Sequence, residues 1–222
     1  MVKRNDLIKD DRSRQSSCLL RLHLFEKLDR ALEGKVTFIC APAGYGKTET
    51  VNSWLEHRGL SAIRLKCVES EHDFFRFTVG ERLNEVKNAQ RLFVFDDVHL
   101  IRSQGTFEKI GTFIRNISEG IHIILLSREK LPFSLSSLRL SGQLTEIRTR
   151  DLCLTNSEMA ELFKDLAGVR LQEDDIEALR NWTEGWPVAV CMAALSFKPG
   201  QSVSDLLDSL TDNLKLNEYF HH

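Results

Sequence analysis

Several features that define particular protein classes are missing from this sequence of 222 residues. No apolar run approaches the ~18 residues that a membrane span needs, and the polar first residues, MVKRND, lack the apolar core of a signal peptide. The five cysteines are odd in number and include no C-x-x-C pair, so we expect no disulfide framework. These absences favour a cytoplasmic protein without a membrane partner.

An excess of charge of one sign is also missing. The 30 Lys and Arg residues face 32 Asp and Glu residues, which argues against a nucleic-acid-binding surface spread over this chain. No Asn/Thr-Lys-x-Asp motif for reading guanine occurs, so a GTPase is not expected.

His72 and Asp73 have no second pair at metal-ligand spacing, which argues against a metal site there. His99 and His122 have apolar neighbours, so we expect hydrogen-bonded core or edge histidines.

What the sequence does contain is centred on residues 35–48, KVTFICAPAGYGKT. The first six residues predict a short buried strand, and the small residues that follow predict a turn that opens a helix. The pattern G-x-x-x-x-G-K-S/T is met except at its first position, where Ala41 replaces glycine. A glycine-rich turn without a ligand is the alternative, but this spacing after an apolar strand favours a phosphate-binding loop.

The residue types of this loop suit an adenine nucleotide and Mg²⁺. Gly44 and Gly46 let the backbone N–H groups turn toward phosphate oxygens, Lys47 reaches the terminal phosphates, and the Thr48 hydroxyl ligates Mg²⁺. The N-terminus of the following helix adds the positive end of its dipole. The nucleotide-binding residues predicted here are Ala41, Pro42, Ala43, Gly44, Tyr45, Gly46, Lys47 and Thr48.

Residues 91–99, RLFVFDDVH, supply a second motif. The apolar run before Asp96 and Asp97 predicts a buried parallel strand whose carboxyl end presents two acids at the edge of the sheet. In a phosphate-loop protein the first acid holds Mg²⁺, and the second can orient or deprotonate the attacking water. Two aspartates at a strand end can instead form a turn or a helix N-cap. Their place after a phosphate loop favours a metal role for Asp96 and a catalytic role for Asp97.

Residues 121–128, IHIILLSR, predict another buried strand that ends in a polar residue and an arginine. A strand beside that of Asp96 would place Arg128 where it could sense the γ-phosphate. The alternative is an arginine that caps the sheet edge. The predicted catalytic residues are Lys47, Asp97 and Arg128.

The order of the elements predicts two structural parts. Residues 1–17 have almost no apolar content and read as a mobile arm. Strands then alternate with helices to about residue 150 and helices follow, which predicts a nucleotide-binding domain over 18–150 and a helical lobe over 151–222. The expected fold class is α/β: a P-loop NTPase core with a parallel sheet and helices on both faces, followed by a small all-helical lobe.

Individual elements follow from periodicity and capping signals. Thr155 and Glu158 form a capping box, Pro187 suits a first helical turn, and Gly59 suits a C-cap. We expect strands within 35–40, 62–68, 91–99, 121–128 and 144–148. We expect helices over 18–32, 48–56, 72–86, 104–117, 155–166, 173–182, 187–197 and 206–219, with a short helical turn within 134–142.

Four stretches together, APAGYGKT, FVFDDVHLI, LLSR and TEGWPVAV, resemble the STAND ATPases of the MalT type. These are bacterial transcription activators of the LuxR family with an N-terminal nucleotide switch, a helical-repeat sensor region and a C-terminal helix-turn-helix. The resemblance runs from about residue 19 to residue 200. The family commonly has Ala or Ser at the position of Ala41, so the departure from the generic motif fits this family.

The resemblance implies ligands and further site residues. Arg21 begins a segment similar to the family's Arg-Pro-Arg-Leu-Leu, which lies near the adenine, although Leu22 and His23 depart from it. Pro187 occupies the family's G-x-P motif, whose proline packs against the base or ribose. The implied ligands are ATP or ADP with Mg²⁺, and DNA would be bound only through a domain that this chain lacks. Because the family's winged-helix, sensor and DNA-binding regions are missing from residues 1–222, we expect a truncated or short relative.

The favoured interpretation is an ATP/ADP switch that hydrolyses slowly and controls self-association in a transcriptional regulator, with self-association in the ATP state and an unknown inducer. The alternative is a small-molecule or nucleotide kinase, or another P-loop ATPase. Dispersed arginines that could form a kinase lid are Arg128, Arg139, Arg148 and Arg150. A third possibility is an ATP-dependent scaffold in which Asp97 does no chemistry.

Overall fold

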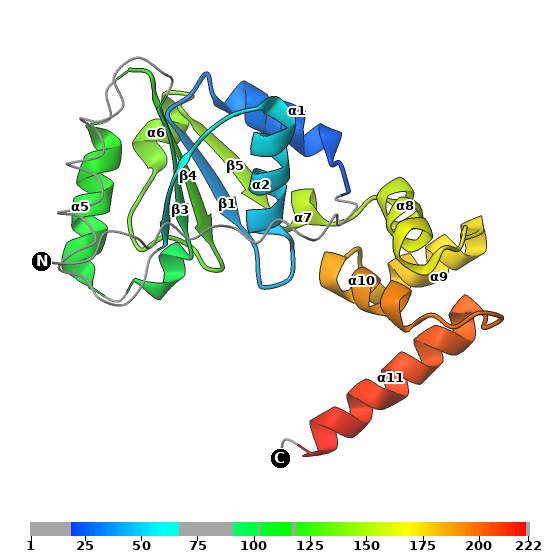
Figure 1. Cartoon of the computed structure of the whole chain (residues 1–222). Helices are drawn as coiled ribbons and strands as arrows, with labels where there is room; N and C mark the ends of the chain where they lie inside the picture. The colour runs from blue at the N-terminus through cyan, green and yellow to red at the C-terminus, as the bar shows by residue number, and fades with distance from the viewer. Residues whose placement is uncertain (1–18, 67–90, 102, 117–118, 221–222) are drawn as a thin grey trace, which may run out of the picture.

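The computed structural model describes residues 19–66, 91–101, 103–116 and 119–220. In these residues one sheet has the strand order β2-β3-β4-β1-β5, and every neighbouring pair is parallel (Figure 1). The strands are β1 (Val36–Cys40), β2 (Ile63–Lys66), β3 (Arg91–Asp96), β4 (Ile121–Ser127) and β5 (Leu144–Arg148). Strand β4 lies between β1 and β3. Because the three strands are parallel, their carboxyl ends lie next to one another at the same end of the sheet.

Helices cover both faces of this sheet (Figure 1). One face carries α1 (Leu22–Ala31) and α2 (Lys47–Arg58), and the other carries α5 (Gln104–Arg115) and α6 (Ser136–Leu140). Side chains alternate along each strand between the two cores: Phe38 and Leu125 join the α5 side, whereas Ile39 and Ile124 join the α1 side. The predicted α/β core with helices on both faces is confirmed.

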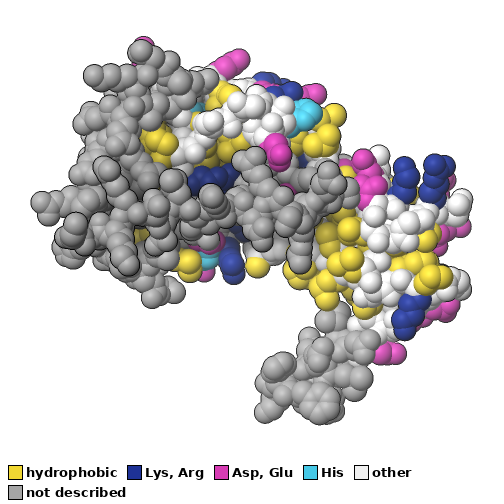
Figure 2. All heavy atoms as spheres, viewed as in Figure 1, with side chains coloured by type: hydrophobic (Ala, Val, Ile, Leu, Met, Phe, Trp, Pro, Cys, Tyr) yellow, Lys and Arg dark blue, Asp and Glu magenta, His cyan; other side chains and the backbone are white. Residues whose placement is uncertain are grey.

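The chain then forms the predicted all-helical lobe through the short helix α7 (Thr149–Leu152). The lobe consists of α8 (Asn156–Ala167), α9 (Glu173–Thr183), α10 (Pro187–Ser196) and α11 (Val203–Phe220). Its own core includes Phe163, Leu179 and Val190, all fully buried. Hydrophobic side chains also reach the surface of this lobe (Figure 2), and α10 exposes Met192 and Leu195.

Several helices begin or end at the capping residues that the sequence predicts. Gly59 ends α2 in the left-handed conformation with φ +61°, and Pro187 opens α10. The Thr155 hydroxyl accepts from the Glu158 N–H at 3.2 Å, and a Glu158 carboxylate oxygen accepts from the Thr155 N–H at 2.7 Å. This reciprocal pair is the predicted capping box.

Other boundaries differ from the expectations. Helix α1 begins only at Leu22, because Arg21 has a non-helical backbone and its side chain turns toward the lobe. The short helices α7 and η1 (Val98–Leu100) were not predicted, since runs of three or four residues carry no periodicity. The expected arm over 1–17 and the expected helix over 72–86 lie outside the described residues. Among the described helices, none is both long enough and apolar enough to cross a bilayer.

Candidate nucleotide-binding site

The predicted phosphate-binding loop joins β1 to α2. Gly44 and Gly46 both have the left-handed backbone, with φ of +78° and +70°. Gly46 is the N-cap residue of α2, and its carbonyl accepts the Thr50 N–H at 2.8 Å. Glycine adopts this conformation without steric cost, so the sequence pattern fits the turn that it builds.

Lys47 lies inside the turn that the loop makes. Its Nζ donates to the carbonyl oxygens of Ala41 at 2.7 Å and Pro42 at 2.8 Å. Burial lowers the pKa of Lys47, and the charge of Arg128 lowers it further, whereas Asp97 and Asp96 act in the opposite direction. The predicted catalytic residues Lys47, Asp97 and Arg128 therefore lie close enough to interact electrostatically.

Thr48 and Asp96 meet across the space between α2 and β3. The Thr48 hydroxyl donates to both carboxylate oxygens of Asp96, at 3.1 and 3.3 Å, and Asp96 is buried. A hydroxyl and a carboxylate are oxygen ligands of the kind that Mg²⁺ prefers. No cluster of three or more His, Cys, Asp or Glu side chains that could hold a metal occurs within the described ranges.

Asp97 follows β3 in a strained conformation. Its φ is +56°, which is uncommon for a residue other than glycine, and its N–H donates to Asp96 Oδ1 at 3.0 Å. The two carboxylates lie in different surroundings: Asp96 is buried, whereas the Asp97 side chain is 39% exposed. His99 Nδ1 lies 3.9 Å from Asp97 Oδ1 and has no hydrogen-bond partner in the described structure. The expectation of a hydrogen-bonded histidine is therefore wrong for the Nδ1 atom of His99.

Arg128 follows β4 next to the start of the loop. Cys40 is in register with Ser127, and the Ala41 N–H donates to the Ser127 carbonyl at 3.3 Å. The strand of Arg128 also pairs with the strand of Asp96, as the sequence interpretation required. Arg128 is exposed at this edge.

The helical lobe contacts the loop directly, through residues that the sequence analysis did not single out. Trp186 Nε1 donates to the Ala43 carbonyl at 3.2 Å, and the Val188 N–H donates to the Gly44 carbonyl at 3.2 Å. The rings of Tyr45 and Trp186 lie 6.3 Å apart between centroids. Pro187, predicted near the base or ribose, lies between these two donors at the start of α10. The G-x-P signal pointed to this segment but not to Trp186.

Arg21, predicted near the adenine, joins the two structural parts. Its Nε donates to Glu158 Oε1 at 3.1 Å, and its two Nη atoms donate to the carbonyls of Leu152 at 3.0 Å and Cys153 at 2.8 Å. Arg21 is 6% exposed and Glu158 8%. These contacts give Arg21 a structural role in holding the lobe, and a contact with the base stays a prediction.

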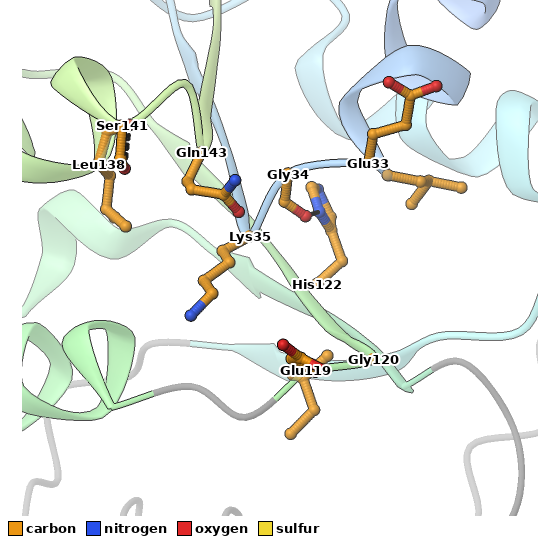
Figure 3. A pocket seen from close by; sticks show the side chains of 11 residues that line it. Glu33, Gly34, Lys35, Glu119, Gly120, His122, Leu138, Ser141 and Gln143 are labelled. Atoms are coloured by element: carbon orange, nitrogen blue, oxygen red, sulfur yellow. Dashed lines mark hydrogen bonds between the residues drawn. The ribbon is translucent and has the colours of Figure 1, made fainter.

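A separate hollow of about 650 Å³ lies at the opposite edge of the sheet (Figure 3). Lys35, Ile121 and Gln143 line it at the amino ends of β1, β4 and β5. Its His122 is bonded through Nδ1 to the Gly34 carbonyl and through Nε2 to Thr37 Oγ1, both at 2.9 Å, as expected for a core histidine. Ligands of open α/β sheets bind at the carboxyl ends of strands, so this hollow is not the phosphate site.

Comparison with known proteins relates the chain to a group of regulators. No protein-family model matches it. The HTH-type transcriptional regulator MalT of Serratia proteamaculans is 27% identical over 223 residues, which cover 85% of this chain and 25% of the relative. MalT of Vibrio parahaemolyticus is 26% identical over 220 residues, covering 82% of this chain and 24% of the relative. The chain thus spans about a quarter of the length of the curated relatives it matches.

Solved structures show the fold. The Holliday junction branch migration motor RuvB of Thermotoga maritima matches with a TM-score of 0.53 at 15% identity, over 88% of this chain and 70% of that one. A RuvB mutant matches with a TM-score of 0.54 at 14% identity, over 80% and 62%. The chain therefore has the fold of the P-loop NTPases and is similar, over most of its length, to about a quarter of the length of MalT-type regulators.

Proposed function

We propose that this chain is the nucleotide switch of a MalT-like transcriptional regulator of the STAND class. ATP or ADP would bind between the α/β core and the helical lobe. The observation that carries this proposal is that one loop contacts both the Asp96 side of the core, through Thr48, and the lobe, through Ala43 and Gly44. A ligand in that loop would touch both parts, so exchange or hydrolysis could change how they pack.

Each residue of the site has a distinct proposed role. Lys47 would exchange its two loop carbonyls for phosphate oxygens, and Thr48 and Asp96 would hold Mg²⁺. Bound Mg²⁺ would neutralise charge on the phosphates. Asp97 would orient the attacking water, and Arg128 would interact with the γ-phosphate. Hydrolysis would be slow, because a switch needs a long-lived ATP state.

The names of the relatives suggest the biological setting. MalT is described as a helix-turn-helix transcriptional regulator, and this chain corresponds to about a quarter of its length. We therefore propose that the switch controls self-association of a larger regulator in the cytoplasm, and that DNA is bound by another part of that protein.

The kinase alternative receives no support from the arginines. Arg139 and Arg148 both pair with Glu146, each with an Nη–Oε1 distance of 3.0 Å. Two of the four arginines considered for a lid are thus engaged on β5 and beside it. Transfer of labelled phosphate from ATP to a metabolite would nevertheless reinstate the kinase interpretation.

The switch is tested by comparing the protein with ATP and with ADP. We expect tight retention of both nucleotides and larger particles in ATP, measured by light scattering after size exclusion. Single-turnover hydrolysis should be slow and should fall further in Asp97→Asn. Identical particle sizes in both nucleotides would contradict the switch, and an unchanged rate in Asp97→Asn would favour a scaffold without Asp97 chemistry.

A further inference from the structure

The helical lobe holds two successive peptide groups of the phosphate-binding loop by their carbonyl oxygens. These are the carbonyls of Ala43, bonded to Trp186 Nε1, and of Gly44, bonded to the Val188 N–H. A trans peptide is planar, so its N–H points opposite to its carbonyl. The N–H groups of Gly44 and Tyr45 therefore point away from the lobe. Neither donates to an acceptor within the described part of the chain.

We propose that Trp186 is a positioning residue for phosphate binding. By holding the Ala43 carbonyl, its indole N–H would turn the Gly44 N–H of the same peptide toward the nucleotide phosphates, which are the groups that such a loop binds. Lobe docking and phosphate binding then favour each other, and the coupling is reciprocal. This inference rests on the proposed nucleotide-binding function and adds the route by which the lobe senses the phosphates.

A rigid turn presents Trp186 to the loop. Glu184 and Gly185 both have the left-handed backbone, with φ of +50° and +75°. The Thr183 hydroxyl accepts the Gly185 N–H at 3.1 Å, and the Thr183 carbonyl accepts the Trp186 N–H at 2.9 Å. A Cβ on Gly185 would lie 2.9 Å from the Leu154 carbonyl oxygen, so the turn is also packed tightly against the start of the lobe. The backbone position from which the indole extends is therefore defined by these contacts.

The loop accepts this approach only because residue 44 is glycine. A Cβ on Gly44 would lie 2.7 Å from Trp186 Nε1 and 3.0 Å from Val188 Cβ. At Gly46, by contrast, nothing lies within 4 Å of the corresponding position. The close approach of the lobe is therefore specific to the part of the loop at Gly44.

Two variants distinguish the effect of the Trp186 indole N–H from that of a change elsewhere in the lobe. Trp186→Phe keeps an aromatic ring and removes the donor, and Trp182→Phe removes the indole bond to Thr211 Oγ1 at 2.9 Å in the same lobe. We expect Mg-ADP affinity, measured by calorimetry, to fall about fivefold in Trp186→Phe, the effect of one neutral hydrogen bond, and to stay unchanged in Trp182→Phe. Adenosine, which lacks phosphates, should bind both variants as it binds the original protein.

The reciprocal effect is read from the indole N–H signals in a ¹⁵N-labelled protein. The chain has three tryptophans, and Trp54 donates to Asp29 whereas the other two donate as described above. The two Phe variants assign the signals. Mg-ADP should shift the Trp186 signal and slow its exchange with solvent, leaving those of Trp54 and Trp182 unchanged.

The outcomes distinguish the two levels of the proposal. If the original protein binds ADP but Trp186→Phe binds it equally well and the Trp186 signal does not move, the positioning role is overturned. An equal loss of adenosine affinity in Trp186→Phe would also overturn it, because the ring would then be acting on the base. Failure of the original protein to bind any nucleotide would instead contradict the proposed function.

Discussion

The two glycines of the phosphate-binding loop differ in what a methyl group would encounter. In Gly44→Ala the new Cβ would meet the Trp186 indole, whereas in Gly46→Ala it would meet open space. Both variants should lose stability, by about 1–2 kcal/mol each, because a side chain is disfavoured in the left-handed backbone. Only Gly44→Ala should release the lobe, seen as faster solvent exchange of the Trp186 indole N–H. Equal exchange in the two variants would show that the close contact at residue 44 does not hold the lobe.

His122 gives the fold a pH dependence that is independent of the nucleotide site. Burial lowers its pKa, although the bond to the Gly34 carbonyl acts to raise it, so the folded protein keeps this ring neutral where the unfolded chain is already protonated. Its contribution to stability is complete above about pH 6.5 and is lost as the pH falls from that value toward the lowered pKa. The free energy of unfolding, measured by urea denaturation, should therefore fall more between pH 7.5 and 5.5 in the original protein than in His122→Gln. Parallel loss in both proteins would contradict this assignment.

At the scale of elements, the buried pair of Arg21 and Glu158 links the segment before α1 to the start of α8. Burial acts to raise the pKa of Glu158, but hydrogen bonds from Arg21 and the Thr155 N–H lower it below its usual range. Glu158 therefore serves both as half of a capping box and as the counter-charge of Arg21. This carboxylate therefore takes part in both the cap of α8 and the attachment of the lobe.

Arg21→Ala should consequently be severe, because it leaves the buried Glu158 charge with only the Thr155 N–H and the half-exposed His23 ring, 3.5 Å away, beside it. We expect a loss of about 3–5 kcal/mol in the free energy of unfolding. The matched control is Arg58→Ala, which breaks an ion pair with Asp29 whose two side chains are each 37% exposed. That pair should contribute about 0–1 kcal/mol. Urea denaturation of both variants at pH 7.5 tests this, and comparable losses would contradict the structural role of Arg21.

Elements with strong local signals could be predicted from the sequence. The apolar run before Asp96 and the capping box at Thr155 act through neighbours a few residues away, so the sequence contains the whole cause. The strand order could not be predicted in the same way, because pairing between distant strands leaves no periodicity. The same limit applies to contacts such as Trp186 with Ala43 and Arg21 with Glu158, which join residues more than a hundred positions apart. A tryptophan in a G-x-P turn gives no sign of the carbonyl it will meet.

At the scale of the whole molecule, the described residues form two cores on the sheet and a third in the lobe, and the predicted phosphate-binding loop lies where the sheet meets the lobe. Lys47, Thr48 and Asp96 gather on the core side, whereas Trp186 and Val188 approach from the lobe side. A nucleotide bound at this loop would therefore contact both the α/β core and the helical lobe. The curated relatives that this chain matches are about four times longer.

Calorimetric titration with Mg-ADP is the most direct test of nucleotide binding at this loop. The variant Lys47→Ala and the control Lys109→Ala, at an exposed lysine, are compared in parallel. We predict one nucleotide bound per chain, an affinity that falls roughly 10- to 100-fold when the Lys47 ammonium is lost, and no change in Lys109→Ala. Absence of binding by the original protein, or equal affinity in Lys47→Ala, would contradict a phosphate site at this loop.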